Sequence, residues 1–204
     1  MSCLVWNCRG LGNPCTVNKL AEMVRAKDPS IVFLAETWVH EARLKVVKRK
    51  IQFENMFVSP RTSIGGGLVL FWRSTIDVSV ERSDKNYIDA IIDKSKESEW
   101  HFTRFYGEPD TQKWHESWDL LRTLKGKFQS PWLCAGDFNE LVRGDEKLRG
   151  NRRSHNQMQV FREAIDACGF VDLGYMGSRF TWSKHYNSGH SIWERLDRAL
   201  CTTD

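Results

Sequence analysis

Short apolar runs and segments of helical periodicity alternate along the chain. The run IVFLA predicts a strand over 31–35, and its lack of polar positions predicts burial on both faces. Just before it, apolar side chains three and four residues apart predict a helix over 16–27 with Thr16 as its N-cap. The pattern therefore predicts a protein that contains both strands and helices.

The same criteria place the remaining elements. They predict helices over 40–51, 110–125 and 155–167, strands over 2–6, 53–58, 67–72, 76–81, 87–93, 99–106, 132–135, 169–173, 179–183 and 191–196, a turn at Gly65–Gly67 and a loop over 143–153. Several strands follow one another across short turns, so these strands must pair in antiparallel fashion. Strands dominate and the helices are distributed among them, which favours an α/β sandwich of two face-to-face sheets over a single doubly wound parallel sheet.

The length and composition fit one globular domain over residues 1–204. Hydrophobic residues make up 41% of the chain and charged residues 27%, a balance that argues against a disordered chain. The formal net charge of +4 permits binding to a polyanion but does not by itself predict it.

The cysteines and the N-terminus bear on the cellular compartment. None of the six cysteines stands in a C-x-x-C pair, so zinc knuckles and thioredoxin-type chemistry have little support, and reduced thiols are the simplest interpretation. The N-terminal segment turns polar at Asn7, and no apolar run approaches the length of about 18 residues that a membrane-spanning helix needs. The sequence therefore predicts an intracellular protein, nuclear or cytoplasmic, without membrane contact.

Three apolar strands end in a polar residue that can take part in chemistry. LVWN ends in Asn7, IVFLAE in Glu36 and WLCAGD in Asp137, with Asn139 two residues further on. Sites in α/β enzymes are built in this way, because the sheet fixes the backbone and the loop carries the reactive groups. The alternative is that these residues only form turns or caps. That alternative is the better one for Asn7 alone and the weaker one for Glu36, because Glu is neither a favoured cap nor a turn residue.

Six motifs, in order, resemble the endonuclease/exonuclease/phosphatase superfamily, and most closely the endonuclease domains of plant LINE-type retrotransposons. The motifs are WNCRGLGNP (6–14), IVFLAET (31–37), FYGEP (105–109), GDFNE (136–140), RFTW (179–182) and ERLDRAL (194–200). GDFN is the most telling of them, and together they run through nearly the whole chain. The resemblance implies a four-layer αββα sandwich of two mixed, mostly antiparallel sheets, and hydrolysis of phosphodiesters with a divalent metal ion.

The resemblance also implies a metal ion and its ligands. It implies Mg²⁺, or Mn²⁺, with Glu36 as the principal ligand and Asn7 beside it. A single carboxylate is sufficient, because Mg²⁺ keeps several water ligands and takes others from the substrate phosphate.

Four catalytic positions follow from the resemblance. It implies that Asp137 orients or deprotonates the attacking water, and that Asn139 holds either Asp137 or the scissile phosphate. Tyr106 is implied to bond near the phosphate or the leaving group, and Asp197 to orient a catalytic histidine.

Two of these positions have a plainer interpretation from the residues alone. Tyr106 is then a core residue of a strand. Asp197 is then a surface partner of Arg195 or Arg198. Both interpretations stay open at the level of sequence.

Arginines indicate where a DNA substrate would be held. The positions expected to contact its phosphate backbone are Arg9, Arg143, Arg149 and Arg152. A solvated surface explains the basic cluster over 143–153 equally well, since Asp145 and Glu146 interrupt it. The expected state is a monomer, and the LINE-type resemblance implies a reverse transcriptase domain in the parent element.

The chain departs from the family pattern at one motif. The family's Ser-Asp-His motif on a last strand does not occur in the sequence, so Asp197 is expected to lack its partner histidine and the fold to lack its last C-terminal strand. We therefore expect a C-terminally truncated domain with impaired catalysis. Two alternatives remain open: a catalytically dead remnant that at most binds nucleic acid, and a phosphoesterase that acts on another phosphate ester.

Overall fold

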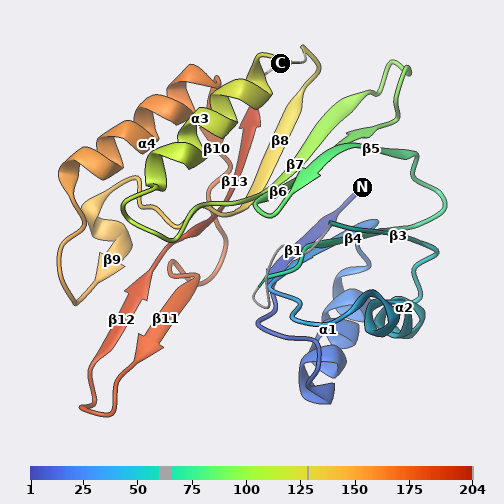
Figure 1. The fold of residues 1–204 in the computed structure, drawn as a ribbon, viewed down its shortest axis with the longest axis horizontal. Coiled ribbons are helices and arrows are strands. Elements are labelled where there is room, and N and C mark those ends of the chain that lie inside the picture. The colour runs from blue at the N-terminus through green and yellow to red at the C-terminus, as the bar shows by residue number, and fades with distance from the viewer. Residues whose placement is uncertain (60–65, 128, 204) are drawn as a thin grey trace. The chain divides into compact units, whose positions relative to one another are not determined.

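The computed structural model describes residues 1–59, 66–127 and 129–203 (Figure 1). The chain divides into two compact units, Met1–Arg104 and Phe105–Asp204. The predicted turn at Gly65–Gly67 lies partly outside the described residues, which include only its last two positions.

The first unit contains a four-stranded sheet in the order β1-β2-β4-β3. Its strands are β1 (Cys3–Asn7), β2 (Ile31–Ala35), β3 (Asn55–Val58) and β4 (Val69–Trp72). Strands β1 and β2 run parallel, while β4 is antiparallel to both of its neighbours, so the sheet is mixed. Every residue of β2 is buried, as predicted from the run IVFLA.

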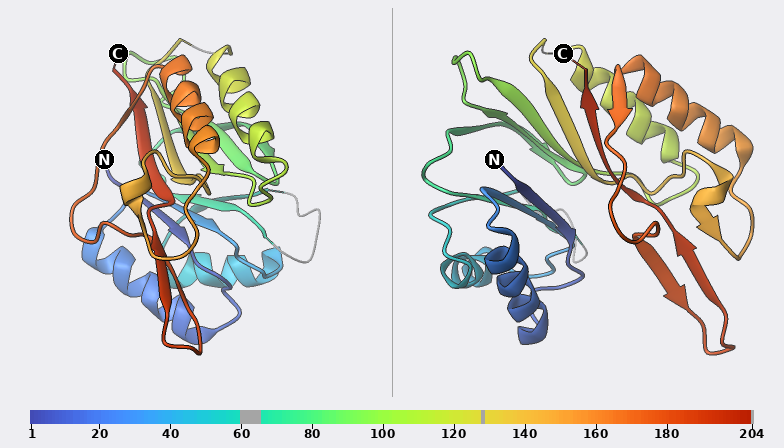
Figure 2. Two further views of the ribbon diagram at one scale, coloured as in Figure 1. Left: turned by 90° about the vertical axis from the view of Figure 1, so that its left-hand side faces the viewer. Right: turned by 180° about the vertical axis from the view of Figure 1, so that it is seen from behind.

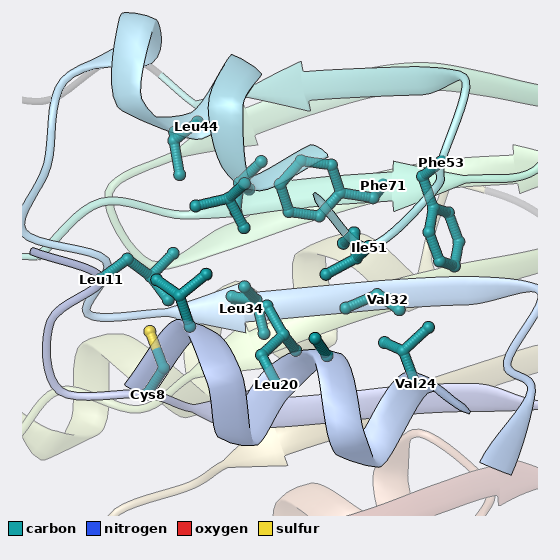
Figure 3. Close-up of a cluster of buried hydrophobic side chains, with 14 residues drawn as sticks. Cys8, Leu11, Leu20, Val24, Val32, Leu34, Leu44, Ile51, Phe53 and Phe71 are labelled. Carbon is teal, nitrogen blue, oxygen red and sulfur yellow. The ribbon is translucent and has the colours of Figure 1, made fainter. Parts of the chain in front are cut away.

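Two helices pack against this sheet. They are α1 (Pro14–Lys27) and α2 (Glu41–Lys50). Their apolar side chains are buried in one cluster with side chains of β2 and β4. In Figure 3, Leu20 and Val24 of α1 lie next to Leu34 and Val32 of β2. Leu11, from the loop that follows β1, is also buried in this cluster, so the core anchors that loop.

Helix α1 begins before the predicted N-cap. The side-chain oxygen of Asn13 accepts a hydrogen bond of 2.9 Å from the backbone N–H of Cys15, and Pro14 occupies the first helical position. Proline is favoured there because its ring fixes φ and its missing N–H would have no partner within the helix. Thr16 lies inside the first turn, so its prediction as the cap was wrong.

Replacing Asn13 with alanine is expected to lower the free energy of unfolding by about 1 kcal/mol, because one backbone donor of α1 loses its acceptor. Thr16→Ala is the control, with an expected change of less than about 0.5 kcal/mol. Urea denaturation followed by circular dichroism measures both variants. A larger loss for Thr16→Ala than for Asn13→Ala would contradict the assignment of the cap.

A second sheet has six strands in the order β10-β13-β8-β7-β6-β5. The first unit contains β5 (Val78–Asp84), β6 (Tyr87–Ile92) and most of β7 (Trp100–Tyr106). Strands β5 and β6 form an antiparallel pair with a register shift between Val80 and Arg82. The antiparallel pairing predicted across short turns is confirmed for this pair.

Over its described residues, the second unit contains two long helices, a short 3₁₀ helix and two groups of strands. The elements are α3 (Trp114–Lys125), β8 (Trp132–Asp137), the 3₁₀ helix η1 (Gly144–Glu146), β9 (Lys147–Leu148), α4 (His155–Ala167), β10 (Phe170–Asp172), β11 (Trp182–His185), β12 (Ser191–Glu194) and β13 (Asp197–Thr202). Helices α3 and α4 lie side by side (Figure 2). The ring centroids of Trp118 in α3 and Phe161 in α4 are 4.4 Å apart, and the two rings stack. Strands β11, β12 and β9 form a separate small sheet.

Two strand boundaries differ from the prediction in ways that bear on the site. Strand β8 continues through Gly136, whose φ of 153° is one that favours glycine, so Asp137 is the last strand residue rather than part of a loop. The predicted last strand over 191–196 ends at Glu194, and a separate strand begins at Asp197.

The predicted α/β fold class is confirmed by the two large sheets and, among the described residues, four α-helices. All six cysteines are free thiols. Within the described ranges, no helix combines the length and the apolar character needed to cross a lipid bilayer.

Candidate active site

Asn7 and Glu36 lie side by side in the first unit. Strands β1 and β2 run parallel in a register that pairs Asn7 with Ala35, so the carboxyl ends of both strands reach the same edge of the sheet. There the Nδ2 atom of Asn7 donates a hydrogen bond of 2.9 Å to Oε1 of Glu36. The two side chains thus form one polar pair, although 29 positions separate them in the sequence.

Backbone hydrogen bonds hold the loops that follow β1 and β2. The N–H of Gly10 donates to the carbonyl of Glu36 at 2.8 Å, and the N–H of Leu11 donates to the carbonyl of Thr37 at 2.9 Å. The N–H of Thr37 in turn donates to the carbonyl of Gly67 at 3.2 Å. Two neighbouring segments therefore fix the backbone at Glu36, which is what a preorganised site requires.

Glu36 has a left-handed backbone conformation, with φ of 53°. A non-glycine residue in this region costs on the order of 1–3 kcal/mol and persists only where its surroundings enforce it. Asn139, in the second unit, has the same feature with φ of 54°. Strained positions of this kind gather at functional sites, so both residues are candidates for chemical roles.

The Oδ1 atom of Asn7 is buried and has no hydrogen-bond partner among the described residues. An unpaired buried amide oxygen costs about 1–3 kcal/mol, so it requires an explanation. Amide and carboxylate oxygens are the ligands that Mg²⁺ and Mn²⁺ prefer. The pair of Asn7 and Glu36 therefore fits a hard divalent cation. No group of three or more His, Cys, Asp and Glu side chains suited to a metal gathers within the described ranges, so the fit depends on this pair.

Cys8 follows Asn7 but is not suited to act as a nucleophile. Burial raises the pKa of its thiol to about 12, although backbone hydrogen bonds oppose this effect. Its Sγ atom donates to the carbonyl of Ala35 at 3.2 Å. Because the thiolate is the reactive form, this side chain has a structural role.

Asp137, Asn139 and Gly107 form a hydrogen-bonded group in the second unit. The side chain of Asp137 accepts a bond of 2.9 Å at Oδ1 from the backbone N–H of Asn139. The Nδ2 atom of Asn139 donates to the carbonyl of Gly107 at 2.7 Å, and the N–H of Gly107 donates to the carbonyl of Asp137 at 2.7 Å. These three bonds fix a buried carboxylate at the end of β8.

Gly107 permits this close approach of two chain segments. A Cβ atom at this position would lie 2.1 Å from the carbonyl oxygen of Phe138, a distance that no side chain can accept. Gly107 directly follows Tyr106, the half-buried last residue of β7. The contact at Gly107 therefore also sets the position of Tyr106.

Strand β13 places Asp197 opposite Asp137. The two residues are direct partners in the antiparallel ladder of β8 and β13, and direct partners project from the same face of a sheet. The Oγ1 atom of Thr181 accepts hydrogen bonds of 3.0 Å from the backbone N–H groups of both Leu196 and Asp197. Thr181 thus fixes the point at which β13 begins.

The arginines on either side of Asp197 belong to a buried ionic cluster. Arg198, whose side chain is fully buried, pairs with Glu146 and, at 2.8 Å, with Asp172. Arg195 contacts the same two carboxylates at 3.3 and 2.8 Å. Burial raises the pKa of the Asp172 carboxyl, but a backbone N–H and the two guanidinium groups outweigh it and hold this pKa below its usual range. Both arginines therefore stabilise the interior of the second unit.

The arginines predicted to contact DNA are all exposed. They are Arg9 in the first unit and Arg143, Arg149 and Arg152 in the second. The predicted loop over 143–153 contains η1 and β9. Arg143 pairs with Asp145 at 3.1 Å, whereas Arg149 and Arg152 line one cavity.

Sequence reasoning missed the structural roles of Gly107 and Thr181. Both lie in motifs singled out in the sequence, FYGEP and RFTW. A glycine directly after a strand marks close approach of another backbone, so Gly107 carried a usable signal. Thr181 carried none, because its partners become visible only when β13 is known.

Comparisons with known proteins bear on this arrangement. Residues 4–204 match the model of the Endonuclease/Exonuclease/phosphatase family. A search of curated proteins gives no match. All the candidate site residues lie within the range that the family model matches.

Several solved structures have the same fold. The endonuclease domain of TRAS1, a telomere-specific non-LTR retrotransposon, is 15% identical, with a TM-score of 0.74 over 99% of this chain and 85% of that chain. The 3′-5′ exonuclease NExo from Neisseria meningitidis is 15% identical, with a TM-score of 0.75 over 99% and 87%. An AP endonuclease from Archaeoglobus fulgidus is 16% identical, with a TM-score of 0.73 over 99% and 87%.

At these identities the solved structures establish the fold, and the fold is the one that the motifs implied. The family match extends over nearly the whole sequence, including both strand ends that carry Asn7 and Glu36 and the GDFNE motif. On this basis, the chain belongs to the endonuclease/exonuclease/phosphatase family.

Proposed function

We propose that the chain is a divalent-metal-dependent phosphodiesterase that cuts DNA by attack of water on a backbone phosphodiester. The observation that carries the proposal is the pair of Asn7 and Glu36. The carboxylate of Glu36, whose backbone is left-handed, accepts a hydrogen bond from Asn7, and the buried Oδ1 atom of Asn7 has no hydrogen-bond partner among the described residues. Support for DNA as the substrate comes from the family, in which the 3′ phosphatase NExo has been solved bound to a product DNA hairpin.

Glu36 and Asn7 are the proposed ligands of Mg²⁺ or Mn²⁺. When bound, such an ion stabilises the negative charge that develops on the phosphate during hydrolysis. Glu36 would supply the neutralising charge and Asn7 a neutral oxygen ligand. The hydrogen bond from Asn7 to Oε1 of Glu36 would hold the carboxylate in one orientation.

Asp137 is the proposed base that orients and deprotonates the attacking water. Its buried carboxylate is held by the backbone N–H of Asn139, whose side chain is engaged by the carbonyl of Gly107, so we assign Asn139 a positioning role. Tyr106 is proposed to donate a hydrogen bond near the phosphate. Asp197, on the same face as Asp137, occupies the position at which the resemblance implies an acid that orients a catalytic histidine. The Ser-Asp-His motif that would supply this histidine does not occur in the sequence, so we propose that catalysis is impaired.

The proposed enzyme is one domain of LINE type. The family match runs through both compact units, which supports treating residues 1–204 as a single catalytic domain. The form of the GDFNE motif and the fold shared with the TRAS1 endonuclease domain support a retrotransposon origin, with a reverse transcriptase in the parent element. The domain is proposed to act as a monomer, with Arg9 and Arg143 contacting backbone phosphates.

Plasmid nicking during a titration with MgCl₂ tests the proposal. The wild-type chain is expected to nick supercoiled DNA slowly, because the Ser-Asp-His motif is missing from the sequence, and EDTA is expected to stop the nicking. Glu36→Gln removes a charge at nearly constant size and is expected to raise the Mg²⁺ concentration for half-maximal nicking by at least about tenfold. Glu41→Gln, on an exposed residue paired with Lys45, is the matched control and should leave this concentration unchanged.

Four results would count against the proposal. Nicking that persists in EDTA would show that the reaction does not require a divalent metal ion. Equal Mg²⁺ dependence of Glu36→Gln and wild type would show that Glu36 is not a metal ligand. Hydrolysis of small phosphate esters without DNA cleavage would favour another phosphoesterase. Salt-dependent DNA binding without any cleavage would identify a binding remnant.

A further inference from the structure

A cavity of about 590 Å³ in the second unit has a mostly basic lining. Its basic side chains are those of Lys147, Arg149, Arg152, Arg153 and His155. None of the proposed catalytic or metal-binding residues lines it. The volume is within the range of small-ligand sites and exceeds what one phosphate group needs.

Two of the cations in this cavity already have partners. The Nζ atom of Lys147 lies 2.6 Å from Oε1 of Glu194, and Nε of Arg153 lies 3.2 Å from Oε1 of Glu140. Both carboxylates are buried. Each pair cancels in charge, so Lys147 and Arg153 add little net positive charge to the cavity.

Arg149 and Arg152 leave the cavity with uncompensated positive charge. Both are exposed, and within the described part of the chain neither takes part in an ion pair. Guanidinium groups present several N–H donors in a planar fork that matches phosphate oxygens. The cavity therefore favours an anion that accepts several hydrogen bonds.

The N-terminus of α4 adds to this preference. His155, which lines the cavity, is the first residue of this 13-residue helix, and the side chain of the N-cap residue Ser154 makes no capping bond. The first N–H groups of a helix have no acceptor within it, and the helix dipole places partial positive charge at this end. Both effects attract a phosphate to the same place as the two arginines.

The loop that carries Arg149 is held in a defined conformation. Arg149 has φ of 65°, and at Gly150, with φ of 74°, a Cβ atom would lie 2.6 Å from Cδ1 of Ile192. Leu148, just before this loop, pairs with Trp193 in the small sheet of β9 and β12. The backbone of Arg149 is thus fixed against β12, which lowers the entropic cost of holding its side chain on a ligand.

We propose that this cavity binds one phosphate group of a nucleic-acid strand, through Arg149 and Arg152, apart from the phosphate that is cut. The inference rests on the proposed function only in taking DNA as the partner. Free inorganic phosphate has the same binding chemistry, so the test includes it as a separate ligand.

Fluorescence anisotropy with a short labelled DNA duplex, in EDTA and over a range of salt concentrations, tests the site. The double variant Arg149→Ala/Arg152→Ala is expected to bind about tenfold more weakly, and its slope of log affinity against log salt should be smaller by about 1, the value for one phosphate contact. Arg122→Ala/Lys127→Ala removes the same charge from exposed positions of the same unit and should change affinity less than about twofold.

Several outcomes would overturn the inference. If the two double variants lower DNA affinity equally, the arginines of the cavity contribute only general surface charge. A slope change near 2 would indicate that they contact two separate phosphates. Thermal melting checks the fold, and Arg149→Gln/Arg152→Gln serves as a second variant should the alanine pair unfold. The same binding loss is expected for that glutamine pair.

Isothermal titration with inorganic phosphate separates the two sources of phosphate. No saturable binding is expected, since a single free phosphate lacks the support of neighbouring contacts along a strand. Saturable binding that disappears in Arg149→Ala/Arg152→Ala would assign the cavity to free phosphate instead. Wild-type protein that shows the expected salt dependence without nicking would leave this inference standing and refute the proposed nuclease activity.

Discussion

Replacing Asp137 with asparagine is expected to slow DNA nicking by about 10²–10⁴-fold at saturating Mg²⁺, the range typical of a lost general base. An amide cannot accept the proton of the attacking water. It is nearly the size of the carboxylate, and its Oδ1 atom can still accept the 2.9 Å hydrogen bond from Asn139. The fold and the affinity for DNA should therefore persist, and single-turnover nicking measures the loss in rate.

Asp119→Asn provides the control for this measurement. Asp119 is an exposed aspartate on α3 that pairs with Arg122, so its replacement should leave the nicking rate within about twofold of wild type. A wild-type rate for Asp137→Asn would show that another group accepts the proton. Asp197, the cross-strand partner of Asp137, would then be the next residue to replace.

Replacing Gly107 with alanine is expected to lower the free energy of unfolding by about 3 kcal/mol or more, because overpacking against backbone has no flexible side chain to relieve it. The new Cβ atom would meet the carbonyl oxygen of Phe138 at 2.1 Å. Relief of that contact would have to separate the ends of β7 and β8, which breaks the hydrogen bonds from Gly107 to Asp137 and from Asn139 to Gly107. Chemical denaturation measures the change.

Gly144→Ala is the matched control in the same unit. A Cβ atom at this position meets no atom within 4 Å, and the backbone there does not have a positive φ. Its replacement should change the free energy of unfolding by less than about 1 kcal/mol. The change should be an increase where alanine acts mainly by lowering the conformational entropy of the unfolded chain. Similar stabilities for Gly107→Ala and Gly144→Ala would show that a side chain at position 107 does not clash with the carbonyl oxygen of Phe138.

Most helices and strands could be predicted because the pattern of apolar residues that specifies each of them lies within one short stretch of the sequence. The apolar run of β2 and the periodic stripes of α1 and α4 are signals of this kind, and their elements formed as predicted. The predicted start of α1 was wrong because Asn13 caps the helix and Pro14 takes its first position, so the helix begins before Thr16. Strand β13 was missed because it contains Arg198, a charged residue that is buried only by partners distant in sequence.

The candidate site was only partly accessible from sequence. Motif resemblance named Asn7, Glu36, Asp137 and Asn139, and their chemical roles stay predictions. The hydrogen bond between Asn7 and Glu36 depends on the parallel register of two strands, and no local pattern specifies that register. The ring of bonds around Gly107 likewise depends on how closely the ends of two strands approach.

At Glu36, the residue that would be best for stability differs from the residue that is proposed for activity, because the backbone there is left-handed. Glycine is the residue that this conformation favours, so a search for more stable variants would tend to select Glu36→Gly. This substitution would remove the backbone strain at position 36, but it would also remove the carboxylate. Thermostable sequences engineered from this chain should therefore be screened for retention of the acid before any of them is used as a catalyst.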